Sequence, residues 1–108
     1  MKQVENDKLV RGVLEDELRR SKEMISSLEG EAGRLTRGSL HVRRKKYKDR
    51  KYEYHYLKYW KDGRSVSVHV PDSELDRVKE ELASRKAYEK EIGDYRKRVR
   101  YLERILKI

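Results

Sequence analysis

The sequence predicts an α+β fold in which two long helices flank a three-stranded antiparallel β-meander. Apolar residues recur at heptad spacing near both ends of the chain, and the segment between them alternates with a period of two. We expect the helices to form an antiparallel coiled-coil hairpin, with the meander packed on the start of the second helix. Residues 1–108 would form a single elongated domain, with helices at about 3–36 and 72–107 and the meander at about 39–70.

The first predicted helix carries a heptad seam. Its seam residues alternate by four and by three: Leu14, Leu18, Ser21, Ile25, Leu28, Ala32 and Leu35. Gly38 follows the last of them and is the expected C-terminal stop of this helix.

The second predicted helix changes its packing face along its length. Asp72 or Ser73 can cap it directly after Pro71. Its early apolar residues are Leu75, Val78 and Leu82, and a heptad then runs through Tyr88, Ile92, Tyr95, Val99, Leu102 and Leu106. The phase slips between these two sets, which indicates that the helix packs first on the sheet and then on the first helix.

Two turn signals determine the predicted strand register. Asp62-Gly63 suits a type I′ hairpin, in which both positions need φ > 0, and it pairs residues whose numbers sum to 125. Asp49-Arg50 is the second expected turn, and it would place Leu40 opposite Tyr59. With this register one sheet face is apolar in all three strands: Leu40, Val42, Leu57, Tyr59, Val66, Val68 and Val70.

The opposite sheet face combines basic and aromatic side chains. Tyr and Trp rings can stack on nucleic-acid bases, and Arg and Lys neutralise phosphates. The candidate nucleic-acid-binding residues are Arg43, Lys45, Tyr47, Tyr52, Tyr54, Tyr56, Lys58, Trp60, Arg64, Ser67 and His69.

The positive charge of the chain is concentrated in the same segment. Residues 34–64 hold twelve Lys or Arg against three Asp or Glu, which gives +9, while the flanking segments nearly cancel. A localised excess of this size indicates a polyanionic partner.

Several classes of function are disfavoured. The chain has no cysteine, no glycine-rich phosphate loop and no metal-ligand spacing among its three histidines, so we expect no catalytic residue, no metal and no cofactor. No apolar run approaches the ~20 residues that span a bilayer, and no secretory h-region follows Met1, so we expect a cytoplasmic protein without a membrane partner. Abundant Lys, Arg and Glu with one Asn and one Gln suit a thermophilic source.

The sequence therefore predicts a non-enzymatic nucleic-acid-binding protein, with duplex DNA favoured over RNA and no small-molecule substrate. An alternative is a structural or interaction module whose aromatic face is buried in a homo-oligomer, such as a homodimer, or against an acidic protein. Both follow from the same observation, because exposed aromatic rings need a covering partner.

The sheet segment and the second helix resemble the arm-type DNA-binding domains of phage tyrosine recombinases. The resemblance is carried by residues 38–44, 52–59 and 61–64 together with that helix. The resemblance covers about residues 38–84 and implies a three-stranded sheet, backed by one helix, that reads the major groove with its open face. It implies contact roles for Arg43, Lys45, Tyr54, Tyr56 and Lys58. The chain also looks like a group of short archaeal and bacterial proteins with a Gly-Ser start and a tyrosine run, which implies no activity.

Overall fold

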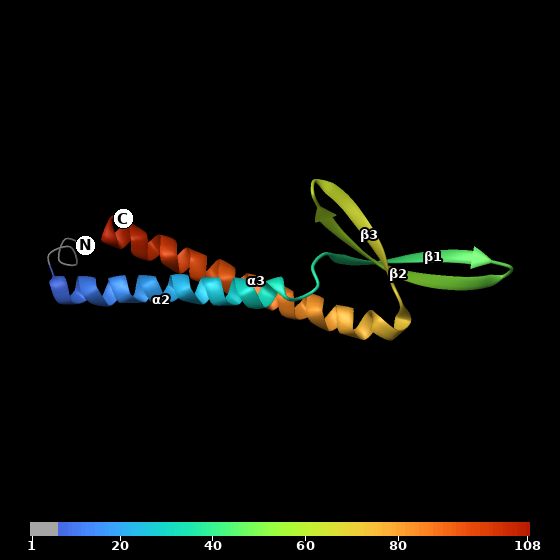
Figure 1. Ribbon diagram of the computed structural model, residues 1–108, viewed down its shortest axis with the longest axis horizontal. Helices are drawn as coiled ribbons and strands as arrows, with labels where there is room; N and C mark the ends of the chain where they lie inside the picture. The colour runs from blue at the N-terminus through green and yellow to red at the C-terminus, as the bar shows by residue number, and fades with distance from the viewer. Residues whose placement is uncertain (1–6) are drawn as a thin grey trace. The chain divides into compact units, whose positions relative to one another are not determined.

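The computed structural model describes residues 7–108 and confirms two helices and one three-stranded antiparallel sheet (Figure 1). The elements in chain order are α2 (Lys8–Gly33), β1 (Ser39–Tyr47), β2 (Arg50–Lys61), β3 (Arg64–Val70) and α3 (Asp72–Leu106). The contacts divide the chain into two compact units. Unit 1 comprises residues up to Arg34 together with Ala87–Ile108, and unit 2 comprises Leu35–Lys86.

Helix α2 is shorter than predicted. Its N-cap is Asp7, whose Oδ1 accepts the backbone N–H groups of Leu9 and Val10 at 3.0 and 3.1 Å. The predicted helical residues 3–6 lie outside the described residues. The helix ends at Gly33, with Arg34 as its C-cap, rather than near residue 36, so the predicted stop at Gly38 is wrong. The N–H of Thr36, beyond this end, bonds to the Glu81 carboxylate.

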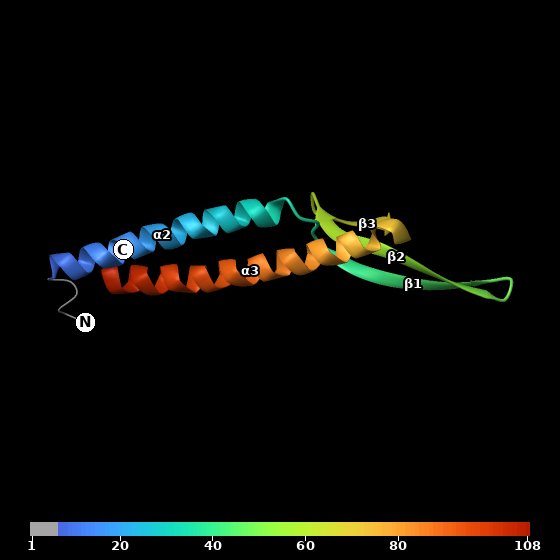
Figure 2. The ribbon, with the colours of Figure 1, turned by 90° about the horizontal axis from the view of Figure 1, so that it is seen from below.

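In unit 1, α2 packs against the C-terminal part of α3 through two apolar clusters (Figure 2). One contains Leu14, Leu18, Val99, Leu102 and Leu106. The other contains Ile25, Leu28, Ala32, Tyr88, Ile92 and Tyr95. The predicted seam residue between them on α2 is Ser21, which is buried and whose hydroxyl has no hydrogen-bond partner.

In unit 2, the strands follow the order β1-β2-β3. The predicted β2–β3 register is confirmed: Asp62 and Gly63 both have positive φ, and Lys61 pairs with Arg64. The predicted β1–β2 turn is wrong by one residue. Its central positions are Lys48 and Asp49, both with positive φ, so pairs sum to 97 instead of 99. A shift of two in this sum preserves which face each side chain occupies.

The apolar face of the sheet packs on the first turns of α3. Buried Leu57, Val70 and Val78 form this cluster, and Leu40, Tyr59, Leu75 and Leu82 pack around it. Val42 and Val68 stay 49% and 44% exposed, so the cluster covers only part of the predicted apolar face.

The phase slip of α3 coincides with the boundary between the units. Leu82 packs in the sheet cluster, Tyr88 packs in an α2 cluster, and the boundary lies after Lys86. The apolar residues before the slip and those after it thus belong to different clusters.

Four side-chain hydrogen bonds hold the segment that leads into β1. Glu81 accepts from both the N–H and the hydroxyl of Thr36, and Arg85 donates to the Leu35 carbonyl at 3.0 Å. Arg37 donates to the Trp60 carbonyl at 2.9 Å. Gly38 has φ +119°, and a Cβ there would collide with the Lys58 carbonyl oxygen. Only glycine fits this entry to the sheet.

Candidate nucleic-acid interface

The register places ten of the eleven candidate residues on one face of the sheet, opposite the face that packs on α3. Arg43 pairs with Tyr54 and Lys45 pairs with Tyr52, while Lys58 pairs with Ser67. The exception is Arg64. It pairs with Lys61 and shares the face of Val66, so the structure does not bring it together with the others by register. We call the face that holds the ten residues the open face.

The aromatic side chains of the open face lie against cations. The Arg43 guanidinium and the Lys58 ammonium lie 5.7 and 5.6 Å from the centre of the Tyr56 ring. The Lys45 ammonium lies 6.0 Å from the Tyr54 ring. These distances fall within the range of cation–π attraction, so the rings restrain where the charges sit.

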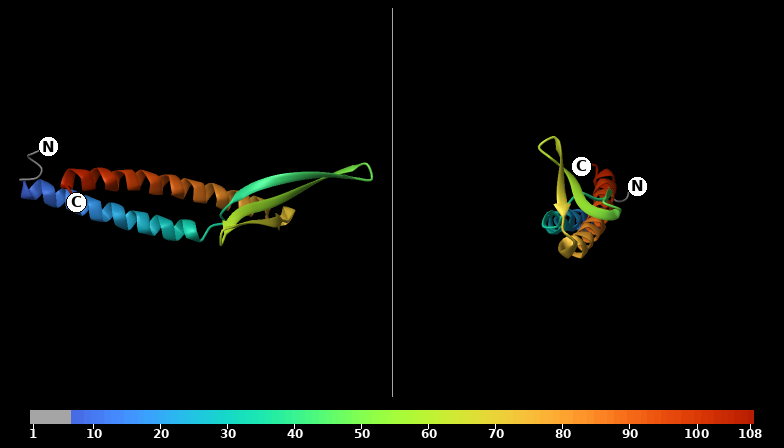
Figure 3. Two further views of the ribbon diagram at one scale, coloured as in Figure 1. Left: turned by 90° about the horizontal axis from the view of Figure 1, so that it is seen from above. Right: turned by 90° about the vertical axis from the view of Figure 1, so that its right-hand side faces the viewer.

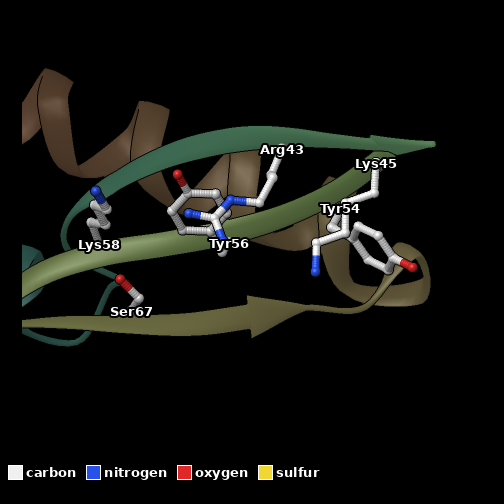
Figure 4. A pocket seen from close by; sticks show the side chains of 6 residues that line it. All are labelled: Arg43, Lys45, Tyr54, Tyr56, Lys58 and Ser67. Atoms are coloured by element: carbon white, nitrogen blue, oxygen red, sulfur yellow. The ribbon is translucent and has the colours of Figure 1, made fainter. Parts of the chain in front are cut away.

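A shallow hollow of about 430 Å³ lies on the open face (Figure 4). Six candidate residues line it: Arg43, Lys45, Tyr54, Tyr56, Lys58 and Ser67. Figure 4 shows the Arg43 side chain lying over the Tyr56 ring. A second hollow of about 370 Å³ shares Lys58 with the first and includes Trp60 and Ser65. Lys58 therefore joins two neighbouring concave sites on one face.

The open face is basic without local neutralisation. In β1, β2 and β3, the residues that alternate onto this face include Arg43, Lys45, Arg50 and Lys58 and no Asp or Glu. The one acid within the strands, Glu53, lies on the other face and pairs with Arg44 at 3.1 Å. An anion approaching the open face meets cations, aromatic rings and serine hydroxyls, and no carboxylate of the strands.

Two residues outside the candidate set also belong to this site. His41 stacks on Tyr56 with ring centres 5.5 Å apart and an interplanar angle of 20°. The Lys48 ammonium lies 5.4 Å from the Tyr47 ring at the β1–β2 turn. The sequence signal for His41 was its alternation with Arg43, whereas nothing local indicated that Lys48 adopts a left-handed conformation.

The histidines do not converge on one point. His41 and His69 lie on the open face, beside Tyr56 and Tyr54, and His55 lies on the face toward α3, where its Nδ1 is buried without a hydrogen-bond partner. Among residues 7–108 no group of His, Asp and Glu is arranged to hold a metal ion. Within the same described part, neither helix has a stretch apolar enough to cross a membrane.

Comparisons with protein-family models, curated proteins and solved structures each find no match to this chain. The resemblance to arm-type recombinase domains thus stays an expectation, and the function has to be inferred from the site itself.

Proposed function

We propose that this protein binds nucleic acid, with duplex DNA favoured, through the open face of its sheet. The observation that carries the proposal is the composition of that face: four cations interleaved with aromatic rings, without an acid in the strands that form it. Phosphates would lie on Arg43, Lys45 and Lys58, and sugars or exposed bases would contact Tyr54, Tyr56 and Trp60.

The cation–π contacts support this assignment. A side chain already restrained over a ring loses less conformational entropy when it binds a phosphate than a freely rotating one does. Arg43 and Lys58 approach the same Tyr56 ring, so two charges are held near one hollow before any ligand arrives.

We also propose that α2 and the C-terminal part of α3 form an antiparallel coiled coil that acts as a scaffold or dimerisation arm. The two apolar clusters of unit 1 support this, because residues early in α2 pack with residues late in α3. Glu29 pairs with Arg96 at 2.8 Å and Glu17 pairs with Arg98 at 3.0 Å beside these clusters.

Binding to duplex and single-stranded DNA over a salt series tests the proposal. The slope of log K against log salt is negative, and each phosphate contact makes it steeper. If Arg43, Lys45 and Lys58 each neutralise a phosphate, changing all three to Ala reduces the magnitude of this slope by about 2.7. At 0.1 M salt the same loss corresponds to about 500-fold weaker binding.

A control variant removes the same charge elsewhere. Lys79, Lys90 and Lys97 are exposed on α3, and their joint change to Ala should leave the slope nearly unchanged. Absence of binding at low salt, or equal losses in the two variants, would overturn the proposal.

The exposed aromatic rings favour a second candidate, a protein partner or second subunit on the open face. Trp60 is 71% exposed and Tyr47 is 62% exposed, and a cover for such rings is favourable. Light scattering with Trp60 emission separates the two candidates. A stable dimer with blue-shifted emission that ignores DNA supports the second candidate, and red-shifted emission that DNA quenches supports the first.

A further inference from the structure

The β1–β2 hairpin extends beyond the rest of its sheet. β3 pairs with only part of β2. The pairing runs from His55, which lies opposite Val70, to Lys61, which lies opposite Arg64. Residues 50–54 of β2 therefore pair with β1 alone, over residues 43–47. Figure 3 shows this two-stranded part projecting past β3 to the Lys48-Asp49 turn. We call residues 43–54 the ribbon.

The ribbon carries cations on both of its faces. It holds seven Lys or Arg against Asp49 and Glu53, a net charge of +5. Arg43, Lys45 and Arg50 alternate onto the open face. The other three strand cations alternate onto the reverse face, which is the continuation of the face that packs on α3 further along: Arg44, Lys46 and Lys51.

The reverse face contains a pair of like charges that oppose each other. Lys46 and Lys51 are direct cross-strand partners, and both are exposed. Like charges at opposed positions destabilise an antiparallel pair. The one acid within the ribbon strands, Glu53, is engaged with Arg44. The two lysines thus repel each other in the free protein, and a bound anion would relieve this repulsion.

Contact through the open face alone does not explain cations on the reverse face, whereas insertion between two phosphate backbones does. A strand ribbon with its side chains is about 10 Å thick, judging from the spacing of packed sheets. The major groove of B-form DNA is about 12 Å wide and admits a two-stranded ribbon, while the minor groove is about 6 Å wide. The major groove of A-form RNA is too narrow for side chains to read.

We infer that the ribbon enters the major groove of B-form DNA turn-first, with the open-face cations toward one phosphate backbone and Lys46 and Lys51 toward the other. This inference rests on the proposed function, and it adds a second contact surface and selects the ligand as B-form duplex. Arg44 pairs with Glu53 across the two strands at the base of the ribbon, so this cation is already partnered in the free protein.

The test changes Lys46 and Lys51 together to Ala and measures binding to a B-form DNA duplex over a salt series. The loss of two phosphate contacts should reduce the magnitude of the slope of log K against log salt by about 1.8. It should also weaken binding at 0.1 M salt by about 60-fold. The melting temperature of the free protein should stay the same or rise, because a repulsive pair is removed. A merely structural role for these lysines would lower it. The change of Lys79 and Lys90 to Ala is the matched control.

Two further duplexes identify the groove. Double-stranded RNA of the same sequence should bind at least about 10-fold more weakly than the DNA duplex, and DNA saturated with the minor-groove ligand netropsin should bind like free DNA. Equal binding of RNA and DNA, or loss of binding with netropsin, overturns groove entry.

The outcomes separate this inference from the proposed function. Wild-type binding of the Lys46→Ala/Lys51→Ala variant, together with loss in the Arg43, Lys45 and Lys58 variant, refutes the ribbon inference and leaves the open-face proposal standing. If the unmodified protein binds no DNA at low salt, both are refuted.

Discussion

Changing Leu57 to Ala should destabilise unit 2 selectively. Leu57 lies on the central strand, is 8% exposed, and packs in the only buried cluster that joins the described sheet to α3. Leu→Ala changes in buried cores cost about 2–5 kcal/mol. The lower part of that range applies here, because this cluster is one layer thick and partly open, so its neighbours can relax into the space. We therefore expect about 2–3 kcal/mol.

Amide hydrogen exchange measures this loss in each unit separately. A loss of 2–3 kcal/mol accelerates exchange of the most protected strand amides by roughly 30- to 150-fold, from the relation of 1.4 kcal/mol to a factor of ten. Amides of α2 should exchange at the wild-type rate, because they belong to unit 1. Val42→Ala is the control, since Val42 lies on the same sheet face but is 49% exposed and should cost little.

Two results would refute this reasoning. If α2 amides accelerate as much as the strand amides, the two units unfold as one cooperative body. If Val42→Ala costs as much as Leu57→Ala, burial against α3 does not hold the sheet.

Three further predictions concern the sheet unit. Gly38→Ala should lower the free energy of unfolding by at least about 2 kcal/mol in a denaturant titration, because it adds left-handed strain and a Cβ collision with the Lys58 carbonyl; a neutral result would contradict it. Asp49→Gly should raise it by about 0.5–1 kcal/mol, since the φ of 64° suits glycine, and the same titration would show any loss. Bonds from Arg77 and then from the Thr36 N–H hold the pKa of Glu81 below its ordinary value of 4.5. A lowered folded-state pKa stabilises the fold above the unfolded-state pKa, and this stabilisation is lost as the pH falls through the folded-state value. Thermal melts of wild type and Glu81→Gln should therefore differ at pH 7 and converge as the pH falls below 4.5 through the lowered folded-state pKa. A constant difference would contradict the assignment.

The face of every strand residue could be predicted from the sequence, although the β1–β2 register could not. Asp62-Gly63 has the residue types that a type I′ turn requires, and its register is confirmed. Lys48-Asp49 also forms a turn with two positive φ angles but contains no glycine. The sequence therefore predicted the turn one residue too late, at Asp49-Arg50. Because side chains alternate with period two, the resulting shift of two left the open face unchanged.

Features that depend on contacts distant in sequence could not be predicted. The N–H of Thr36, which follows α2, bonds to the carboxylate of Glu81, and Glu81 lies 45 residues further along the chain. The hollow depends on the side-chain conformations of Arg43 and Lys58 around Tyr56, and a strand pattern carries no information on these. Arg64 is a different case, because the predicted Asp62-Gly63 register already pairs it with Lys61 and so places it on the face opposite the other candidates.

Departures from local sequence rules concentrate in the ribbon. Its turn uses Lys48 and Asp49 at two left-handed positions, and Lys46 opposes Lys51 across the strands. Several features elsewhere follow the rules: Asp7 caps α2, glycine completes the β2–β3 turn, and the heptad residues of α2 and α3 pack into two apolar clusters. Natural sequences depart from such rules mainly at functional sites, where a bound partner offsets the lost stability. The ribbon should accordingly be the part of the described sheet whose amides gain the most exchange protection when DNA binds.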